Sequence, residues 1–238
     1  MTYSRFFLSC LRFPLVLLPA VIFDLGRIPG AARCSVSRLI IALAHLYSVA
    51  SLAGNQKVSV SYEELQNVLS LENKTRVHLV LAFLKERGIL TGKLMDGFFT
   101  LLYLFPLPLL PKVFLKVLPS LDRADSFFSY PVFLTVLPVN VYTKAVYLYL
   151  ISRSQQEGIP LEVSFEDLKG VLKLRKKKIK ESISWLEKWG LIKVRVSGST
   201  IFLSGLNFRW PKELLRKSRE LYPEHLFFRI FHGGKNAN

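Results

Sequence analysis

The chain has 238 residues, and half of them are hydrophobic, which provides enough apolar surface for a folded core and excludes a wholly disordered protein. Its 33 Lys and Arg outnumber 17 Asp and Glu, so the formal net charge is +16. A charge excess of this size indicates what kind of partner the protein binds and does not indicate its fold. It favours a nucleic acid or, as the main competitor, an anionic membrane surface.

Cysteine and histidine usage indicates neither a disulfide framework nor a metal site. Cys10 and Cys34 do not form a CxxC pair, and the four histidines show no ligand spacing along the chain. A reducing cytosol is the compartment that fits such a sequence.

The N-terminal segment has a basic start and an apolar run, as a secretory signal does. Arg12 and Pro14 interrupt the run, and its uninterrupted part at 15–23 is too short to span a bilayer. FPLVLLP at 13–19 also echoes YPVFLTVLP at 130–138. We therefore interpret the segment as structural and expect no export and no membrane insertion.

An internal repeat organises the chain. VSVSYEELQNVLSL at 58–71 aligns without gaps with LEVSFEDLKGVLKL at 161–174. RVHLVLAFLKERGIL at 76–90 then aligns with KIKESISWLEKWGLI at 178–192, with one residue fewer in between. A repeat length of about a hundred residues is typical of a duplicated domain and not of a solenoid.

Each copy is expected to form a helix, a short strand, two further helices and a hairpin. Apolar runs at 37–50 and 143–154 predict the first helix of each copy. The remaining signals are matched pairs: capping boxes at Ser61-x-x-Glu64 and Ser164-x-x-Asp167, terminal glycines Gly88 and Gly190, and hairpin turns Asp96-Gly97 and Ser197-Gly198.

This order of elements, with the junctions FLKERGIL and SWLEKWGLIKV, resembles the winged helix-turn-helix superfamily twice, over 13–105 and 130–208. The resemblance implies a mainly α fold with small β-hairpin wings (α+β), built as two tandem winged helix-turn-helix domains. The expected organisation is a first domain at 1–105 with an apolar extension, a proline-rich apolar linker at 106–129, a basic second domain at 130–210, and a basic helical tail at 211–238.

In such domains the third helix enters the major groove and the wing follows the backbone or minor groove. If Ile179, Ile183 and Leu186 face the core of the second domain, the opposite face carries lysines, Ser184 and Glu181. Residues 169–219 contain 15 Lys and Arg but three acids, whereas a solvated helix usually mixes charges. The expected DNA-binding residues of this domain are Lys173, Arg175, Lys176, Lys177, Lys180, Ser184, Lys188, Lys193 and Arg195.

The equivalent helix of the first copy has modest charge but side chains suited to base edges. Its candidate DNA-binding residues are Asn73, Lys74, Thr75, Arg76 and His78. This domain is either a second DNA reader or a dimerisation domain, and both interpretations stay open. Trp185 and Trp189 are expected to pack between helix and wing, because Phe83 occupies the position that matches Trp185.

The linker and tail carry two further expectations. Prolines at 106, 108, 111 and 119 exclude a regular helix from the apolar stretch 105–121, which we expect to make an ordered contact between domains or subunits. The tail begins with Pro211 at a helix start and is expected to pack on the second domain while adding phosphate contacts.

The sequence contains no phosphate loop, dinucleotide fingerprint, HExxH or GxSxG elbow, so we expect neither an enzyme, nor a cofactor, nor a small-molecule ligand. Tandem winged-helix proteins with a more basic second domain resemble plasmid or phage replication initiators. The resemblance implies a cytoplasmic, nucleoid-associated protein that binds double-stranded DNA, forms a homodimer and contacts host replication proteins. A transcription regulator, a protein-binding adaptor and a membrane-surface protein are the alternatives.

Overall fold

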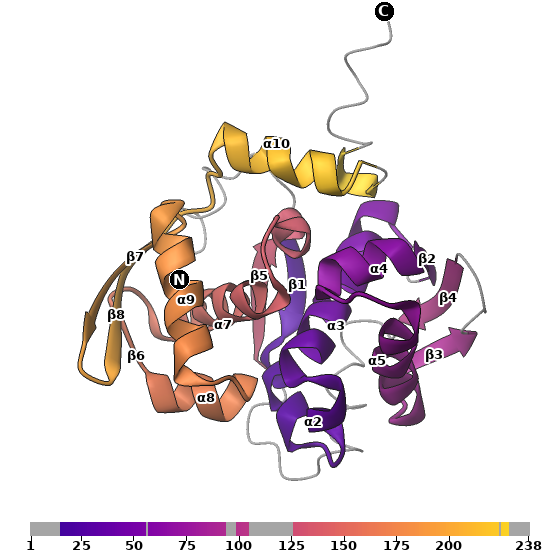
Figure 1. Cartoon of the computed structure of the whole chain (residues 1–238), viewed down its shortest axis with the longest axis horizontal. Helices are drawn as coiled ribbons and strands as arrows, with labels where there is room; N and C mark the ends of the chain where they lie inside the picture. Colours follow the sequence, from indigo (N-terminus) through magenta and orange to yellow (C-terminus); the bar gives the residue numbers. More distant parts are fainter. Residues whose placement is uncertain (1–14, 56, 94–98, 105–125, 224, 229–238) are drawn as a thin grey trace, which may run out of the picture.

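The structure is a computed structural model that describes residues 15–55, 57–93, 99–104, 126–223 and 225–228. The protein is mixed α+β. In the described residues the strands form one two-stranded and two three-stranded antiparallel sheets. Figure 1 shows two helical units side by side, each with a small sheet at its outer end.

The same order of elements occurs in both units, as the repeat predicts. The first unit contains α3 (Val36–Ala53), β2 (Lys57–Ser61), α4 (Tyr62–Leu69), α5 (Lys74–Glu86), β3 (Leu90–Lys93) and β4 (Phe99–Leu104), with a short helix α2 (Ala31–Cys34) before α3. The second contains α7 (Val141–Glu157), β6 (Leu161–Ser164), α8 (Phe165–Leu172), α9 (Lys176–Lys188), β7 (Ile192–Ser197) and β8 (Thr200–Leu206). In both sheets the last strand lies between the other two, in the orders β2-β4-β3 and β6-β8-β7.

The helix ends follow the predicted signals. Ser61 and Ser164 are the N-caps of α4 and α8, and each hydroxyl accepts a hydrogen bond from the backbone three residues later. Gly88 and Gly190 follow α5 and α9 with φ values of 68° and 66°, where a side chain would be strained. Gly198, with φ 59°, forms the turn between β7 and β8, whereas the predicted turn at 96–97 lies outside the described residues.

A two-stranded ribbon joins the units. β1 (Leu15–Pro19) pairs antiparallel with β5 (Phe127–Pro131), and a 3-10 helix follows each strand, η1 (Ala20–Arg27) and η3 (Val132–Val136). The expected boundary between linker and second domain, at 129–130, therefore falls inside the strand β5. The similarity between 13–19 and 130–138 does not match equivalent elements. Residues 15–19 form the strand β1, whereas most of the similar stretch at 132–138 lies in η3. The rest of the expected linker contact, at 105–125, lies outside the described residues.

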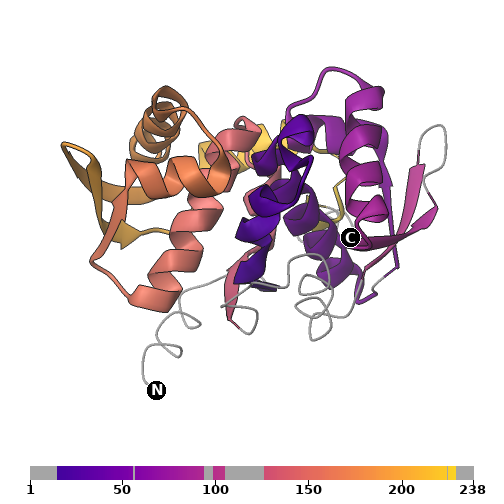
Figure 2. The same cartoon turned by 90° about the horizontal axis from the view of Figure 1, so that it is seen from below.

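The core is continuous across both units. α3 and α7 pack against each other between the two outer sheets (Figures 1 and 2). By length and composition α3 alone, among the described helices, is apolar enough to cross a membrane, and 78% of that stretch is buried inside the protein. Its apolar character is therefore used for packing between the units.

The sequence predicts that the tail packs on the second unit. In the structure it instead lies over the junction of the two units. Its helix α10 (Lys212–Leu221) crosses the top of the molecule in Figure 1. Before the helix, Trp210 packs against Phe133 of η3 with ring centroids 3.8 Å apart, and after it Phe227 packs on the same ring at 5.6 Å. These aromatic contacts hold the segments on both sides of α10 against η3.

Candidate nucleic-acid interface and buried polar junction

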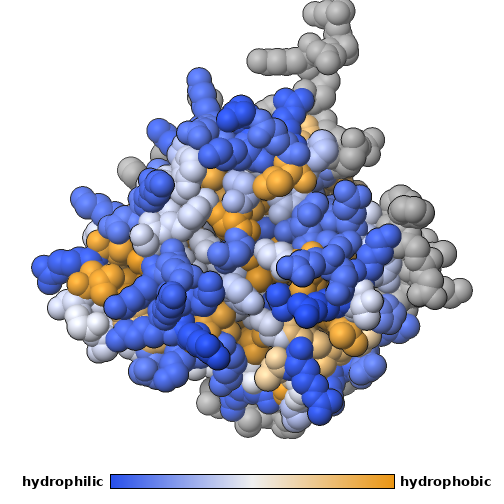
Figure 3. Space-filling model, in the orientation of Figure 1, coloured by the Kyte–Doolittle hydropathy of each residue, from blue (hydrophilic) through white to orange (hydrophobic). Residues whose placement is uncertain are grey.

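Helix α9 has the two faces that its sequence predicts. Ile179, Ile183 and Leu186 are buried, whereas the four residues expected on the opposite face are all exposed, namely Lys177, Lys180, Ser184 and Lys188. Figure 3 shows a hydrophilic surface over α9 and over the tail helix α10. The first of these surfaces carries the predicted DNA-binding residues of α9, and the second belongs to the tail that is expected to add phosphate contacts.

The turn before α9 extends the same basic surface. Lys173, Arg175 and Lys176 are exposed, and Lys173 ends α8 in the left-handed conformation with φ 52°. Arg175 occupies the N-cap of α9 and makes no side-chain capping bond, whereas Asn73 caps α5 by accepting a hydrogen bond from the Arg76 backbone at 3.0 Å. The second copy has thus replaced a capping side chain, usually worth about 1 kcal/mol, with a cation.

Most of the cations on this surface are available to a partner. The acid Glu181 pairs with Lys178 at 2.9 Å, and this hydrogen bond lowers the pKa of the carboxylate. Within the part of the chain that the structure describes, none of the other predicted cations of this unit forms an ion pair with an acid: Lys173, Arg175, Lys176, Lys177, Lys180, Lys188, Lys193 and Arg195. Their charge is therefore not neutralised within the described structure.

The hairpin formed by β7 and β8 adds two cations. Lys193 and Arg195 are exposed and alternate along β7, so both side chains project from one face of the strand. The Arg195 guanidinium lies 5.6 Å from the centroid of Phe202 on the neighbouring strand, a contact that orients it. The pairing shifts register between Lys193 and Val194 without changing the alternation along β7.

The equivalent surface of the first unit is different. Asn73, Lys74, Thr75 and Arg76 are exposed and His78 is half-buried, but the amide oxygen of Asn73 is engaged as the helix cap. Leu79, 54% exposed, occupies the position of Glu181, and Ala82 that of Ser184. The middle of α5 is thus apolar where the middle of α9 is polar.

The two tryptophans pack on the core as expected, whereas the contacts described for their rings are with each other and with the tail helix and not with the wing. Trp185 and Trp189 are half-buried against the core, with their ring centroids 5.8 Å apart. Lys217 of α10 lies over Trp189 at 5.2 Å from the ring centroid, and it also pairs with Glu213. Trp189 therefore connects the end of α9 to the tail helix.

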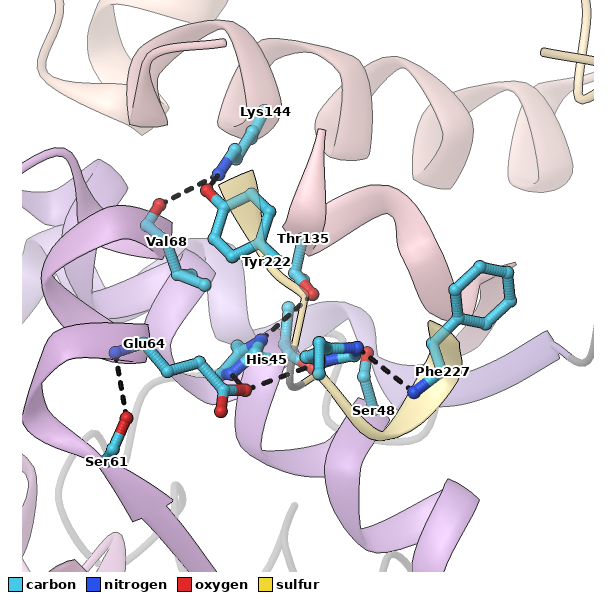
Figure 4. A network of polar contacts seen from close by, with 11 residues as sticks. His45, Ser48, Ser61, Glu64, Val68, Thr135, Lys144, Tyr222 and Phe227 are labelled. Atoms are coloured by element: carbon cyan, nitrogen blue, oxygen red, sulfur yellow. Dashed lines mark hydrogen bonds and ion pairs between the residues drawn. The ribbon is translucent and has the colours of Figure 1, made fainter. Parts of the chain in front are cut away.

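A group of polar side chains at the centre of the protein was not predicted from the sequence. We name it the buried polar junction; its members are His45, Glu64, Thr135, Lys144, Tyr222 and His225 (Figure 4). They come from α3, α4, η3, α7 and the tail, so the group joins both units to the C-terminal segment. Sequence spacing could not reveal it, because its members are brought together only by packing of elements far apart in the chain.

Glu64 departs from the role of its counterpart in the repeat. In the second unit, Asp167 completes the predicted capping box by accepting a hydrogen bond from the Ser164 backbone at 3.3 Å. In the first unit the Glu64 carboxylate instead lies 2.8 Å from Nε2 of the fully buried His45. The predicted capping box is therefore only half formed at Ser61. Burial alone would raise the pKa of Glu64, but the hydrogen bond with His45 acts in the opposite direction, and the pKa is lowered.

The two histidines of the junction, His45 and His225, differ in the partner of Nδ1. Nδ1 of His45 is 3.1 Å from the Thr135 hydroxyl, which orients the ring so that Nε2 faces Glu64. Nδ1 of His225 accepts a hydrogen bond from the Phe227 backbone at 3.2 Å. Among the described residues, Nε2 of His225 is buried without a hydrogen-bond partner and lies 3.6 Å from the same Glu64 oxygen. Burial lowers the pKa of His225 to about 3, so its ring is neutral.

Lys144 is the other unusual member of the junction. Its side chain is fully buried, and Nζ donates to the Val68 carbonyl at 3.0 Å and to the Tyr222 hydroxyl at 3.2 Å. Burial lowers the pKa of this amine to about 7, because the charged form has lost its hydration. The lysine thus ties α7 to the end of α4 and to the tail.

Comparison of the chain with protein-family models, with curated proteins and with solved structures finds no match in any of the three.

Proposed function

We propose that the chain is a tandem winged-helix protein that binds double-stranded DNA through α9 and the β7–β8 hairpin. The order helix, strand, helix, helix, hairpin, with the last strand in the middle of the sheet, supports this assignment for both units. In this arrangement α9 is the helix that enters the major groove, and the hairpin is the wing that follows the phosphate backbone.

The observation that carries the proposal is the set of eight exposed cations that lack an acidic partner among the described residues. They lie on α9, on the turn before it and on β7. Lysines on such a surface chiefly contact phosphates, which provide affinity without sequence reading. Arg175 and Arg195 are the two side chains of this surface with the donor geometry that discriminates guanine.

The first unit has a separate role in this proposal. Its α5 offers Lys74, Thr75 and Arg76 at the helix start, but exposes Leu79 in the middle. This composition suits subunit pairing or a second, weaker DNA contact. A division of this kind between two units supports a plasmid or phage replication initiator that binds origin repeats as a homodimer and recruits host replication proteins.

A charge-reversal pair tests the DNA interface. Lys177→Glu with Lys180→Glu changes two exposed residues. Of the described contacts with the core, the variant removes only that of the Lys180 amine over the Phe165 ring, at 5.9 Å from its centroid, and leaves the apolar packing of α9 intact, so the fold should persist. We expect this variant to lose duplex binding, measured by fluorescence anisotropy with a labelled duplex at several salt concentrations. For the wild type, neutralising up to eight phosphates predicts a slope of log K against log salt as steep as about −7.

Arg33→Glu with Lys85→Glu is the matched control, because both residues are exposed in the first unit and the net charge changes equally. Unchanged affinity and salt slope in the α9 variant would refute the groove assignment, as would equal losses in both variants. Footprinting on the protein's own replicon then separates two roles. Repeated sites at an origin support an initiator, whereas one operator beside a promoter supports a transcription regulator.

A further inference from the structure

The junction brings together a set of groups that metal ions bind. His45, Glu64 and His225 each offer one ligand atom, and these atoms lie within 4.8 Å of one another. Two neutral imidazoles and one carboxylate form the ligand set of three-coordinate zinc sites that keep a fourth position for water. Carboxylate-only sites would favour calcium or magnesium, whereas imidazole nitrogen favours zinc and its neighbours among the transition metals.

Each ligand is held by a different part of the fold. His45 is placed by α3, Glu64 by the first turn of α4, and His225 by the segment after α10. Two ligands of a tetrahedral zinc ion lie about 3.3 Å apart, because each is about 2.0–2.1 Å from the metal. The separations of 2.8 Å and 3.6 Å between the Glu64 oxygen and the two Nε2 atoms bracket this value.

Three further observations favour a ligand at this position. Nε2 of His225 is buried without a hydrogen-bond partner among the described residues, which is costly unless an ion or another group satisfies it. The contact between Nδ1 of His45 and Thr135 is the outer-shell bond that orients a metal-binding imidazole. In addition, Glu64 has left the capping box that its counterpart Asp167 completes.

We propose that His45, Glu64 and His225 bind a single Zn²⁺ ion that fixes the C-terminal segment to the first unit. The exposed part of the site is at Glu64, whose side chain is 21% accessible, so this is where the ion enters and a water completes its coordination. Binding moves the ring proton of His45 from Nε2, where it faces Glu64, to Nδ1, where it donates to the Thr135 hydroxyl. It also moves the ring proton of His225 to Nδ1, so the 3.2 Å bond from Phe227 is lost in exchange for the metal bond.

Zinc binding by these three residues would restrain the two units relative to each other. Because the tail begins in the second unit and His225 reaches the first, a metal bond at this point restrains both units through one side chain. Lys144 lies in the same junction, and since its pKa is near 7 it is largely neutral at pH 8, where it does not oppose a divalent cation. The binding assay is therefore done at pH 8.

The test uses the full chain, stripped with a chelator and titrated with Zn²⁺ in competition with a chromogenic chelator. We expect one Zn²⁺ per chain with a Kd of about 1 µM or tighter. Glu64→Gln and His225→Gln should each raise the Kd at least tenfold, and Thr135→Val about tenfold through the ring it orients. His78→Gln is the matched control, because His78 lies on α5 outside the site and should leave the Kd unchanged.

Two readouts on the wild type keep the test valid if a variant does not fold, as judged by its circular dichroism. Co²⁺ should give the intense visible absorption of a four-coordinate site, and Zn²⁺ should slow hydrogen exchange at the backbone amide of Phe228, which donates to the His225 carbonyl at 2.9 Å. Absence of binding at about 100 µM Zn²⁺ would overturn the proposal. So would an unchanged Kd in folded His225→Gln protein, or zinc binding without protection of the Phe228 amide.

Discussion

Replacement of Lys144 by methionine is the sharpest test of the buried polar junction. Methionine retains an unbranched apolar stem of similar length but removes the amine, which donates to the Val68 carbonyl and the Tyr222 hydroxyl. The side chain is fully buried, so water does not replace these contacts. The variant therefore removes one buried titratable group and two hydrogen bonds at the meeting point of the two units and the tail.

The expected magnitude follows from the pKa of the amine, which burial lowers from 10.5 to about 7. Between these two pH values the unfolded chain holds one proton more than the folded chain, so the free energy of unfolding of the wild type rises with pH. The free-energy cost of burying the protonated Lys144 amine is fully present below pH 7 and absent above pH 10.5. Across the whole window it amounts to about 5 kcal/mol, and between pH 7.5 and 9.5 to about 3 kcal/mol.

The methionine variant lacks this dependence. Two acceptors lose their donor, which costs about 1–3 kcal/mol at every pH. We therefore expect the variant to be more stable than the wild type at pH 7.5, and this advantage to shrink by about 3 kcal/mol at pH 9.5.

The measurement is urea unfolding of both proteins at pH 7.5, 8.5 and 9.5. The difference between their unfolding free energies is the relevant quantity, because the other titrating groups are common to both. Lys212→Met, at an exposed position of α10, is the control and should show no change of this difference with pH. A constant difference for Lys144→Met would show that the amine keeps an ordinary pKa and would refute the reasoning.

Three further changes test the packing, each by urea unfolding. Ser164→Ala should lower the unfolding free energy by about 1 kcal/mol, because α8 loses its N-cap; an effect below the error would contradict the role of the capping box. Gly190→Ala should also cost about 1 kcal/mol, entirely as backbone strain, since φ is +66° and nothing lies within 4 Å of the added carbon. Phe133→Ala should cost about 3–5 kcal/mol and expose the tail to proteolysis, because the ring packs on Trp210 and Phe227; a tail that stays protected would argue against this anchoring.

Local chemistry determined much of the architecture. The spacing of Ile179, Ile183 and Leu186 sets which face of α9 is buried, so the exposed position of its lysines follows from helical periodicity. Ser164 and Gly190 mark helix ends because their backbone and hydroxyl preferences act within a few residues. Comparison of the two copies in the sequence also identifies α9 as the more basic of the two matched helices.

Only the tertiary structure decided how the copies meet. β1 and β5 pair although more than a hundred residues separate them, and a strand of five residues carries no signal for its partner. The capping-box pattern at Ser61 and Glu64 predicts two reciprocal bonds, but in the folded chain the Glu64 carboxylate contacts His45 instead of the Ser61 backbone. Burial of Lys144 and the approach of His225 likewise depend on the path of the tail across the junction. Contacts between distant segments are determined by the packing of the whole chain, and for this reason the sequence alone predicted the basic helix but not the junction.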